Sequence, residues 1–190
     1  MGFLDALLGR TKPVKPNLDE LFALPGAALT LEAGTDFKPT GSGSVCFRAA
    51  EGKAFADIEK DVTDLLSMGK DATPVQVTVD SYRFTWVVCK HSADDPEGLV
   101  TDLHAVNSSL QGGGFGPQLL CTIMAFRDSG GRSLGLVYLY KRGTFYPFAP
   151  LAGEQRDNAL ELQIRGTLGS DLKIEPDLSR WMPIWGAPGL

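Results

Sequence analysis

The chain has 190 residues, of which 43% are hydrophobic and 22% charged, so it can build one domain with an apolar core and is not a disordered chain. Its 18 Lys and Arg against 23 Asp and Glu give a formal net charge of -5, which argues against nucleic acid as a partner because phosphate backbones select basic surfaces. No apolar run reaches the roughly 18 residues of a membrane span. The start of the chain lacks the basic leader and cleavage site of a secretory signal, so we expect a cytoplasmic protein.

The first residues, G-F-L-D-A-L-L-G-R, place their apolar side chains at helical spacing and predict a short amphipathic helix. A basic linker interrupted by Pro13 and Pro16 follows, so we divide the chain into this tip and linker, 1–16, and a single domain, 17–190. A helix this short is unstable alone in water and needs its own core, a partner helix or a membrane to fold against. The predicted contact residues are Phe3, Leu4, Leu7, Leu8, Arg10, Lys12 and Lys15.

The next segment predicts a short helix capped by Asn17 that ends at Pro25 and Gly26. Residues 27–32 and 44–49 are interpreted as two strands of a hairpin, joined by the Gly- and Ser-rich loop 40–43. A longer helix is then expected, because apolar residues recur at spacings of three and four. Its apolar stripe consists of Phe55, Ile58, Val62, Leu65 and Leu66.

The second half of the domain alternates between strand and helix patterns. Strands are expected at 75–79 and 82–88 around a turn at Asp80 and Ser81, and a helix begins at Asp95 and Pro96 and stops at Gly112. A second hairpin is predicted from 119–126 and 134–140 with its turn at 128–131.

The remaining residues predict an edge strand at 143–148, because Pro147 lacks a ladder donor, and a helix at 153–168. The aromatic tail 181–185 is broken by proline and is interpreted as an extended or single-turn segment that packs into the core. Taken together, the elements predict the α+β class, with a mainly antiparallel sheet packed with helices.

Groups that could carry catalysis or bind metal are few. His91 and His104 stand outside metal-ligand spacings, so no metal or cofactor is expected. Cys89 and His91 share a strand face without being aimed at each other as nucleophile and base, which favours a strand-end histidine. His104 is interpreted as a half-exposed structural histidine. The three cysteines, Cys46, Cys89 and Cys121, lie in apolar strand-like runs, so we expect them to be buried. Their odd number and wide separation favour a reducing compartment.

The run Q-G-G-G-F-G-P at 111–117 leaves a helix instead of entering one, which is the wrong order for a phosphate loop. It is interpreted as a helix-to-strand connection, with the alternative of a partner-binding loop that uses Phe115 as an exposed anchor. No H-E-x-x-H motif occurs and no catalytic constellation is found, so the sequence does not predict an enzyme.

An alternative function, a small-molecule-binding domain or an uncharacterised enzyme, would require an aromatic pocket. The candidate lining residues are Tyr82, Trp86, Tyr138 and Tyr140. Such residues recur at period two along strands, and rows of this kind more often build core than pocket.

Two stretches of the chain carry a family resemblance: M-G-F-L-D-A-L-L-G-R-T-K-P-V-K-P-N-L-D-E-L-F-A-L-P-G-A-A at the start, and D-L-S-R-W-M-P-I-W-G at 177–186. They are similar to the PspA-associated protein family PspAB of actinobacteria and some archaea, which is linked with phage-shock-type envelope stress. The resemblance implies a non-enzymatic accessory protein that binds a PspA-like membrane-remodelling coiled-coil protein and works with a PspAA-like companion. It brings no catalytic residues.

Two further expectations accompany this resemblance. The order of elements is similar to the YbjN or secretion-chaperone-like α+β fold, whose members bind other proteins. The cations behind the tip would favour a peripheral contact with anionic lipid at the inner face of the cell membrane. Oligomeric state is left open, a homo-oligomer included.

Overall fold

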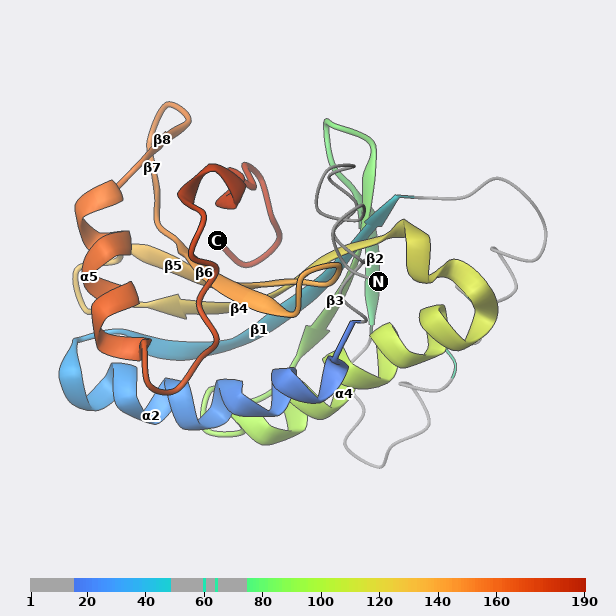
Figure 1. The fold of residues 1–190 in the computed structure, drawn as a ribbon, viewed down its shortest axis with the longest axis horizontal. Helices are drawn as coiled ribbons and strands as arrows, with labels where there is room; N and C mark the ends of the chain where they lie inside the picture. Colours follow the sequence, from blue (N-terminus) through green and yellow to red (C-terminus); the bar gives the residue numbers. More distant parts are fainter. Residues whose placement is uncertain (1–15, 49–59, 61–63, 65–74) are drawn as a thin grey trace, which may run out of the picture.

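A computed structural model describes residues 16–48, 60, 64 and 75–190 (Figure 1). Its main feature is a six-stranded antiparallel sheet with the order β2-β3-β1-β4-β5-β6. The strands are β1 (Lys38–Arg48), β2 (Gln76–Val79), β3 (Phe84–Lys90), β4 (Leu119–Arg127), β5 (Ser133–Leu139) and β6 (Thr144–Phe148). The α+β class and the mainly antiparallel sheet predicted from the sequence are therefore confirmed.

Helices cover one face of this sheet, the lower side in Figure 1. The 3₁₀ turn η1 (Leu18–Ala23), α2 (Leu24–Gly34) and α4 (Pro96–Leu110) form this layer, and α5 (Asn158–Leu168) packs against α2 and β6. Their apolar side chains join one face of the strands in the larger hydrophobic core, in which Leu31, Leu103 and Phe126 are fully buried.

The C-terminal segment after α5 covers the opposite face (Figure 1). It contains one 3₁₀ turn, η4 (Leu178–Arg180), and buries Trp181 and Ala187 in a second, smaller core. The tail is thus a mostly irregular segment with a single turn that packs into the core, as its proline and aromatic pattern predicts. Since both faces of the central strands are buried, neighbours such as Val45 and Cys46 contribute to different cores.

The strand predicted at 27–32 is wrong, because these residues belong to helix α2. Pro25 was expected to end the preceding helix, but it lies in the first turn of α2, where the proline has no hydrogen bond to lose and its fixed φ suits the helix. Leu24, Ala28 and Leu31 then recur on one buried face. The apolar run therefore has helical periodicity once Pro25 is placed at the start of a helix.

The loop predicted at 40–43 is also wrong, since β1 runs through it without a turn. The register of β1 against β4 shifts between Pro39 and Gly43, so the glycines accommodate an irregularity inside the strand. Gly41 has φ +73, and a Cβ at this position would collide with the backbone carbonyl oxygen of His91. Close approach of two backbones, and not a hairpin turn, explains the glycine at this position.

Other predicted elements agree with the structure. The Asp80 turn joins β2 and β3, and its carboxylate oxygen Oδ1 accepts hydrogen bonds from the backbone N–H groups of Tyr82 and Phe84, both at 2.9 Å. Asp95 caps α4 through the N–H of Gly98 at 2.9 Å. The hairpin of β4 and β5 and the edge position of β6 are confirmed.

Helix α5 begins later than predicted. The residues before it form the small hairpin of β7 (Pro150–Leu151) and β8 (Gln155–Arg156), and Gly153 at its tip has φ +73. Of the helix predicted around the stripe from Phe55 to Leu66, the structure describes Lys60 and Asp64, which are both helical, and the rest of that prediction lies outside the described residues.

Candidate functional site

An apolar cavity of about 550 Å³ lies between the second face of the sheet and the C-terminal tail. We call it the tail cavity. The strands supply its floor and one wall, and the tail supplies the other wall. It is lined by Cys46, Tyr82, Phe84, Trp86, Leu120, Cys121, Leu139, Tyr146, Met182, Pro183, Ile184 and Trp185. Its size is that of a small-molecule binding pocket.

Two cysteines lie side by side on the floor of the tail cavity. Cys46 of β1 and Cys121 of β4 are direct cross-strand partners, and both are free thiols. The hydrogen bond with Cys121, together with burial, raises the pKa of Cys46 far above that of an ordinary thiol. The Cys46 thiol is therefore neutral at physiological pH and offers a polarizable, apolar surface instead of a nucleophile.

A β-bulge shapes this floor. The pairing of β1 with β4 passes from Cys46 and Cys121 directly to Phe47 and Leu119, so Leu120 is an extra residue on β4. Neighbours in a regular strand point to opposite faces, but here Leu120 and Cys121 both line the tail cavity. The bulge thus directs one additional apolar side chain into the cavity.

Two aromatic side chains of the wall, Trp86 and Tyr146, have their polar atoms already hydrogen-bonded within the protein. Trp86 donates from Nε1 to Asp80 Oδ2 at 2.8 Å, and the Tyr146 hydroxyl donates to the backbone oxygen of Met182 at 2.8 Å. Burial raises the pKa of Tyr146 well above 10, so its hydroxyl stays protonated and keeps this bond. These two side chains consequently present their ring faces to an occupant.

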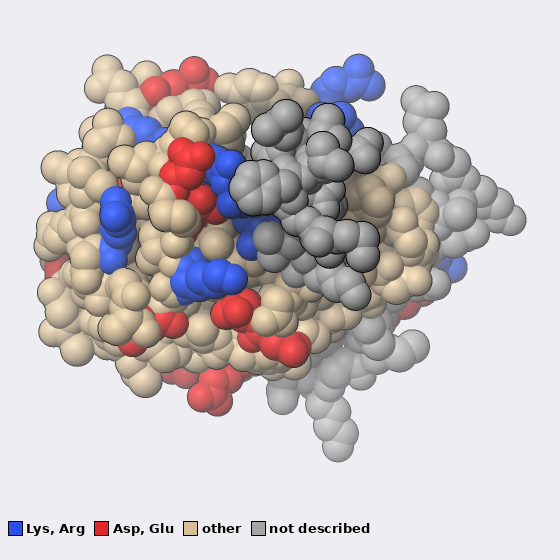
Figure 2. Space-filling view, in the orientation of Figure 1, with Lys and Arg blue, Asp and Glu red and all other residues tan. Residues whose placement is uncertain are grey.

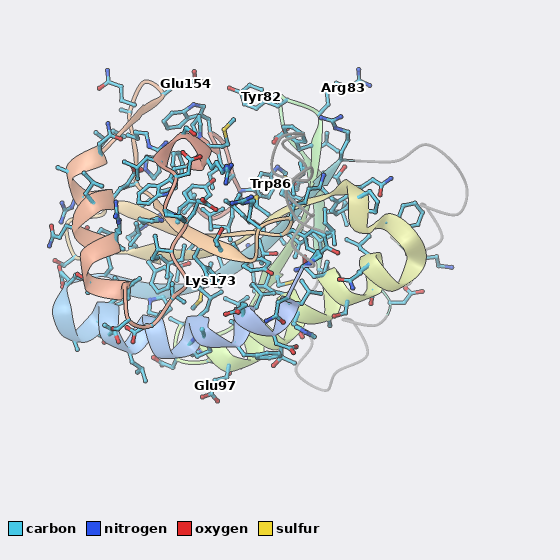
Figure 3. All side chains as sticks on the ribbon, in the orientation of Figure 1. Tyr82, Arg83, Trp86, Glu97, Glu154 and Lys173 are labelled. Atoms are coloured by element: carbon cyan, nitrogen blue, oxygen red, sulfur yellow. The ribbon has the colours of Figure 1, made fainter. Side chains whose placement is uncertain are left out.

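The mouth of the tail cavity lies between two hairpins. Figure 3 shows Tyr82 directed from the tip of the β2–β3 hairpin toward Glu154 on the β7–β8 turn, with Arg83 on the other side of the tip. The Tyr82 hydroxyl donates to Glu154 Oε1 at 3.3 Å, and the carboxylate charge of Glu154 raises the pKa of Tyr82. Tyr82 is 52% exposed and Met182 59%, so the entrance is open to solvent and has a negative charge at its edge.

The tail is held over the sheet by buried polar contacts as well as by packing. Trp181 stacks on Tyr146 with ring centroids 6.0 Å apart, and its Nε1 donates to the backbone oxygen of Glu175 at 3.0 Å. Arg156 donates from Nη1 to the backbone oxygen of Trp181 at 2.6 Å, while its Nε lies 2.9 Å from Glu161 Oε1. These bonds fix the wall of the tail cavity in place.

The four-aromatic pocket proposed from the sequence is only partly correct. Tyr82 and Trp86 line the tail cavity, but Tyr138 and Tyr140 lie in the larger core on the helix side of the sheet. The Tyr138 hydroxyl donates to the backbone oxygen of Asn17 at 2.7 Å, which confirms its place under η1. Because strand residues alternate, Leu139 of β5 faces the tail cavity instead.

The histidines are structural in their contacts. His91 lies between two carboxylates, with Nδ1 2.9 Å from Asp95 Oδ2 and Nε2 2.8 Å from Asp102 Oδ2. Burial lowers the pKa of His91, but these hydrogen bonds outweigh it and the pKa is raised overall. Cys89 faces the larger core, where burial raises its pKa to about 12. His104 is half-buried, as expected.

The predicted partner and membrane residues Phe3, Leu4, Leu7, Leu8, Arg10, Lys12 and Lys15 lie outside the described residues. Phe115 is not the exposed anchor that the sequence indicated: it is partly buried and packs against the larger core from the turn η2 (Gln111–Phe115). Gly114 in this turn has φ 87, which interrupts the helical geometry. The turn is a helix-to-strand connection, and its use as a partner loop stays a prediction.

Charge and metal-ligand chemistry are dispersed. Figure 2 shows acidic and basic side chains mixed over the face that it presents. Within residues 16–48, 60, 64 and 75–190 there is no group of three or more His, Cys, Asp or Glu side chains that could hold a metal ion. In the same part of the chain, no helix has the length and apolar character needed to cross a membrane.

The fold and the tail cavity define an α+β protein with an apolar cavity between its sheet and its own C-terminal tail. The chain belongs to the PspAB family, PspA associated protein B, whose model matches residues 1–189. The resemblance seen at the two ends of the sequence therefore extends over the whole chain. No curated protein matches the chain. No solved structure matches it either, so the likeness to YbjN or secretion-chaperone-like folds stays a prediction.

Proposed function

We propose that this protein is a non-enzymatic accessory protein of a PspA-type envelope stress response and acts by binding a PspA-like partner. The observation that carries the proposal is the match of nearly the whole chain to the family of PspA-associated proteins. The chemistry of the tail cavity supports a binding role. The pKa of the Cys46 thiol is raised, whereas that of a catalytic cysteine is lowered, and the lining of the cavity contains no charged side chain.

The proposed contact with the partner is the amphipathic tip. Phe3, Leu4, Leu7 and Leu8 give it one apolar flank, which would pack against a coiled-coil surface as an added amphipathic helix. The cations Arg10, Lys12 and Lys15 follow directly and would add attraction to an acidic protein surface or to anionic lipid. We favour the protein partner, with a peripheral position at the inner face of the membrane as a consequence of that binding.

The test is co-purification of the tagged full chain with its PspA-like partner, in parallel with flotation on vesicles of anionic and zwitterionic phospholipid. Replacing Phe3, Leu4, Leu7 and Leu8 by serine should abolish co-purification. Replacing Arg10, Lys12 and Lys15 by glutamine is the matched control for charge: it should weaken flotation on anionic vesicles more than it weakens capture of the partner.

Two results would contradict the proposal. Retention of the partner by the serine variant would remove the role of the tip. Flotation without any capture of the partner by the unmodified chain would leave lipid as the target instead of protein. A PspAA-like companion can be added to the same pull-down to determine whether it joins the complex or competes for it.

A further inference from the structure

We infer that the tail cavity is a binding site for one uncharged hydrocarbon chain of about the length of a long acyl group. This inference is independent of the partner proposal, because it rests on the described residues of the domain and not on the amphipathic tip. It gives the small-molecule alternative a definite place and a ligand class. The arguments concern the volume of the cavity, its hydrogen-bonding groups and its charge.

The volume sets the length of the occupant. A cavity of about 550 Å³ accommodates about 18 groups of the size of a water molecule or a methylene, at roughly 30 Å³ each. This corresponds to one long alkyl or acyl chain. It is far too little for the two chains of a phospholipid together, so a single-chain amphiphile is the expected ligand.

The hydrogen-bonding groups select against a polar occupant. The indole N–H of Trp86 and the hydroxyls of Tyr146 and Tyr82 are each already donated to a partner within the protein. The floor thiols of Cys46 and Cys121 interact with each other. A polar group brought into this space would lose its bonds to water and find these donors already engaged, whereas a hydrocarbon chain loses nothing of that kind.

The charge distribution selects against an anionic head group. No Lys or Arg lines the tail cavity, and the Glu154 carboxylate lies at its mouth against Tyr82. The Asp80 carboxylate accepts the hydrogen bond from the indole N–H of Trp86 and adds a second negative charge near the cavity. A fatty-acid carboxylate at the entrance would therefore meet like charge without a cationic partner in the lining. A neutral glycerol ester of the same chain avoids this repulsion.

The experiment titrates the purified full chain with 1-palmitoylglycerol, with palmitate as the charged comparison of equal chain length. Tryptophan fluorescence is the readout, since Trp86 and Trp185 line the cavity. We expect saturable binding of one neutral molecule per chain and at least tenfold weaker binding of palmitate. A monoacylglycerol brominated along its chain should quench the tryptophan emission, which tests insertion on the unmodified protein.

Cavity filling provides the matched variants. Leu139→Trp places an indole into the tail cavity and should weaken 1-palmitoylglycerol binding at least tenfold, whereas Leu29→Trp on the exposed surface of α2 should leave it unchanged. Ile184→Trp fills the same space from the tail, should the first variant not fold. The bromine quenching does not depend on any variant.

Several results would overturn the inference. They are the absence of saturable binding, equal binding by the filled variants, quenching no greater than that by the unbrominated lipid, or a preference for palmitate. Loss of partner capture in Leu139→Trp without lipid binding by the native chain would also overturn it, since the occupant would then be an apolar group of a protein. The partner proposal is judged separately, by co-purification.

Discussion

Replacing Trp181 is expected to release the C-terminal tail from the sheet. The side chain is 5% exposed, stacks on Tyr146 and donates from Nε1 to the Glu175 backbone oxygen. Removing a buried tryptophan side chain in Trp181→Ala should lower the free energy of unfolding by about 3–5 kcal/mol, because packing is lost and a void is left. Trp181→Phe keeps a ring against Tyr146 but leaves the carbonyl without its donor, and should lower it by about 1–2 kcal/mol.

The measurement is urea-induced unfolding followed by far-ultraviolet circular dichroism, which does not depend on the tryptophan removed. Trp185→Ala serves as the control, because this ring is only partly buried and meets Phe148 edge-on at 5.1 Å. The free energy of unfolding of Trp185→Ala should be lower than that of the native chain by about 1–2 kcal/mol. A decrease below about 1 kcal/mol for Trp181→Ala, or equal decreases for Trp181→Ala and Trp181→Phe, would refute the role assigned to Trp181.

Three further predictions concern pH, backbone geometry and thiol reactivity. The raised pKa of His91 means that its pairing with Asp95 and Asp102 stabilises the fold fully below the ordinary value of 6.5 and less as pH rises through the folded-state pKa. The difference in unfolding free energy between the native chain and His91→Gln should therefore shrink from pH 5.5 to 8.5, and growth of that difference would contradict the assignment. Gly41→Ala should lower the unfolding free energy by at least about 2 kcal/mol, measured in urea, because φ is +73 and the added carbon meets a backbone carbonyl; an unchanged midpoint would argue against this geometry. Cys46 should react with iodoacetamide at pH 8 at least about tenfold more slowly in the folded protein than in urea, as burial and its raised pKa require, and mass spectrometry of the labelled peptides would reveal comparable rates if the thiol were accessible.

The fold class could be predicted from the sequence because several elements carry strong local signals. Asp80 and Asp95 occupy positions where a carboxylate accepts hydrogen bonds from backbone N–H groups. As predicted, Asp80 begins the turn between β2 and β3, and Asp95 caps helix α4. Pro25 misled the prediction because proline is compatible both with the end of a helix and with its first turn. The choice depends on whether Leu24, Ala28 and Leu31 find a surface to cover, which is a tertiary property.

The tail cavity could not be predicted from the local pattern of apolar and polar residues in the sequence. The row of Tyr82, Phe84 and Trp86 was visible, but which residues of β5 share its side of the sheet depends on register between distant strands. The bulge at Leu120 is likewise set by the pairing of β1 with β4. The stretch D-L-S-R-W-M-P-I-W-G was the available signal, since its aromatic and proline residues form one wall of the cavity.

The covering of the second sheet face by the C-terminal tail has a consequence for biosynthesis. All six strands of the sheet precede residue 149, whereas Trp181 and Ala187, which cover that face, leave the ribosome later. Until then Trp86, Ile123 and Val137 have no cover from the tail, and a nascent chain in this state is prone to self-association. Truncations ahead of Trp181 should accordingly accumulate as aggregates or as clients of chaperones, with all of their strands present.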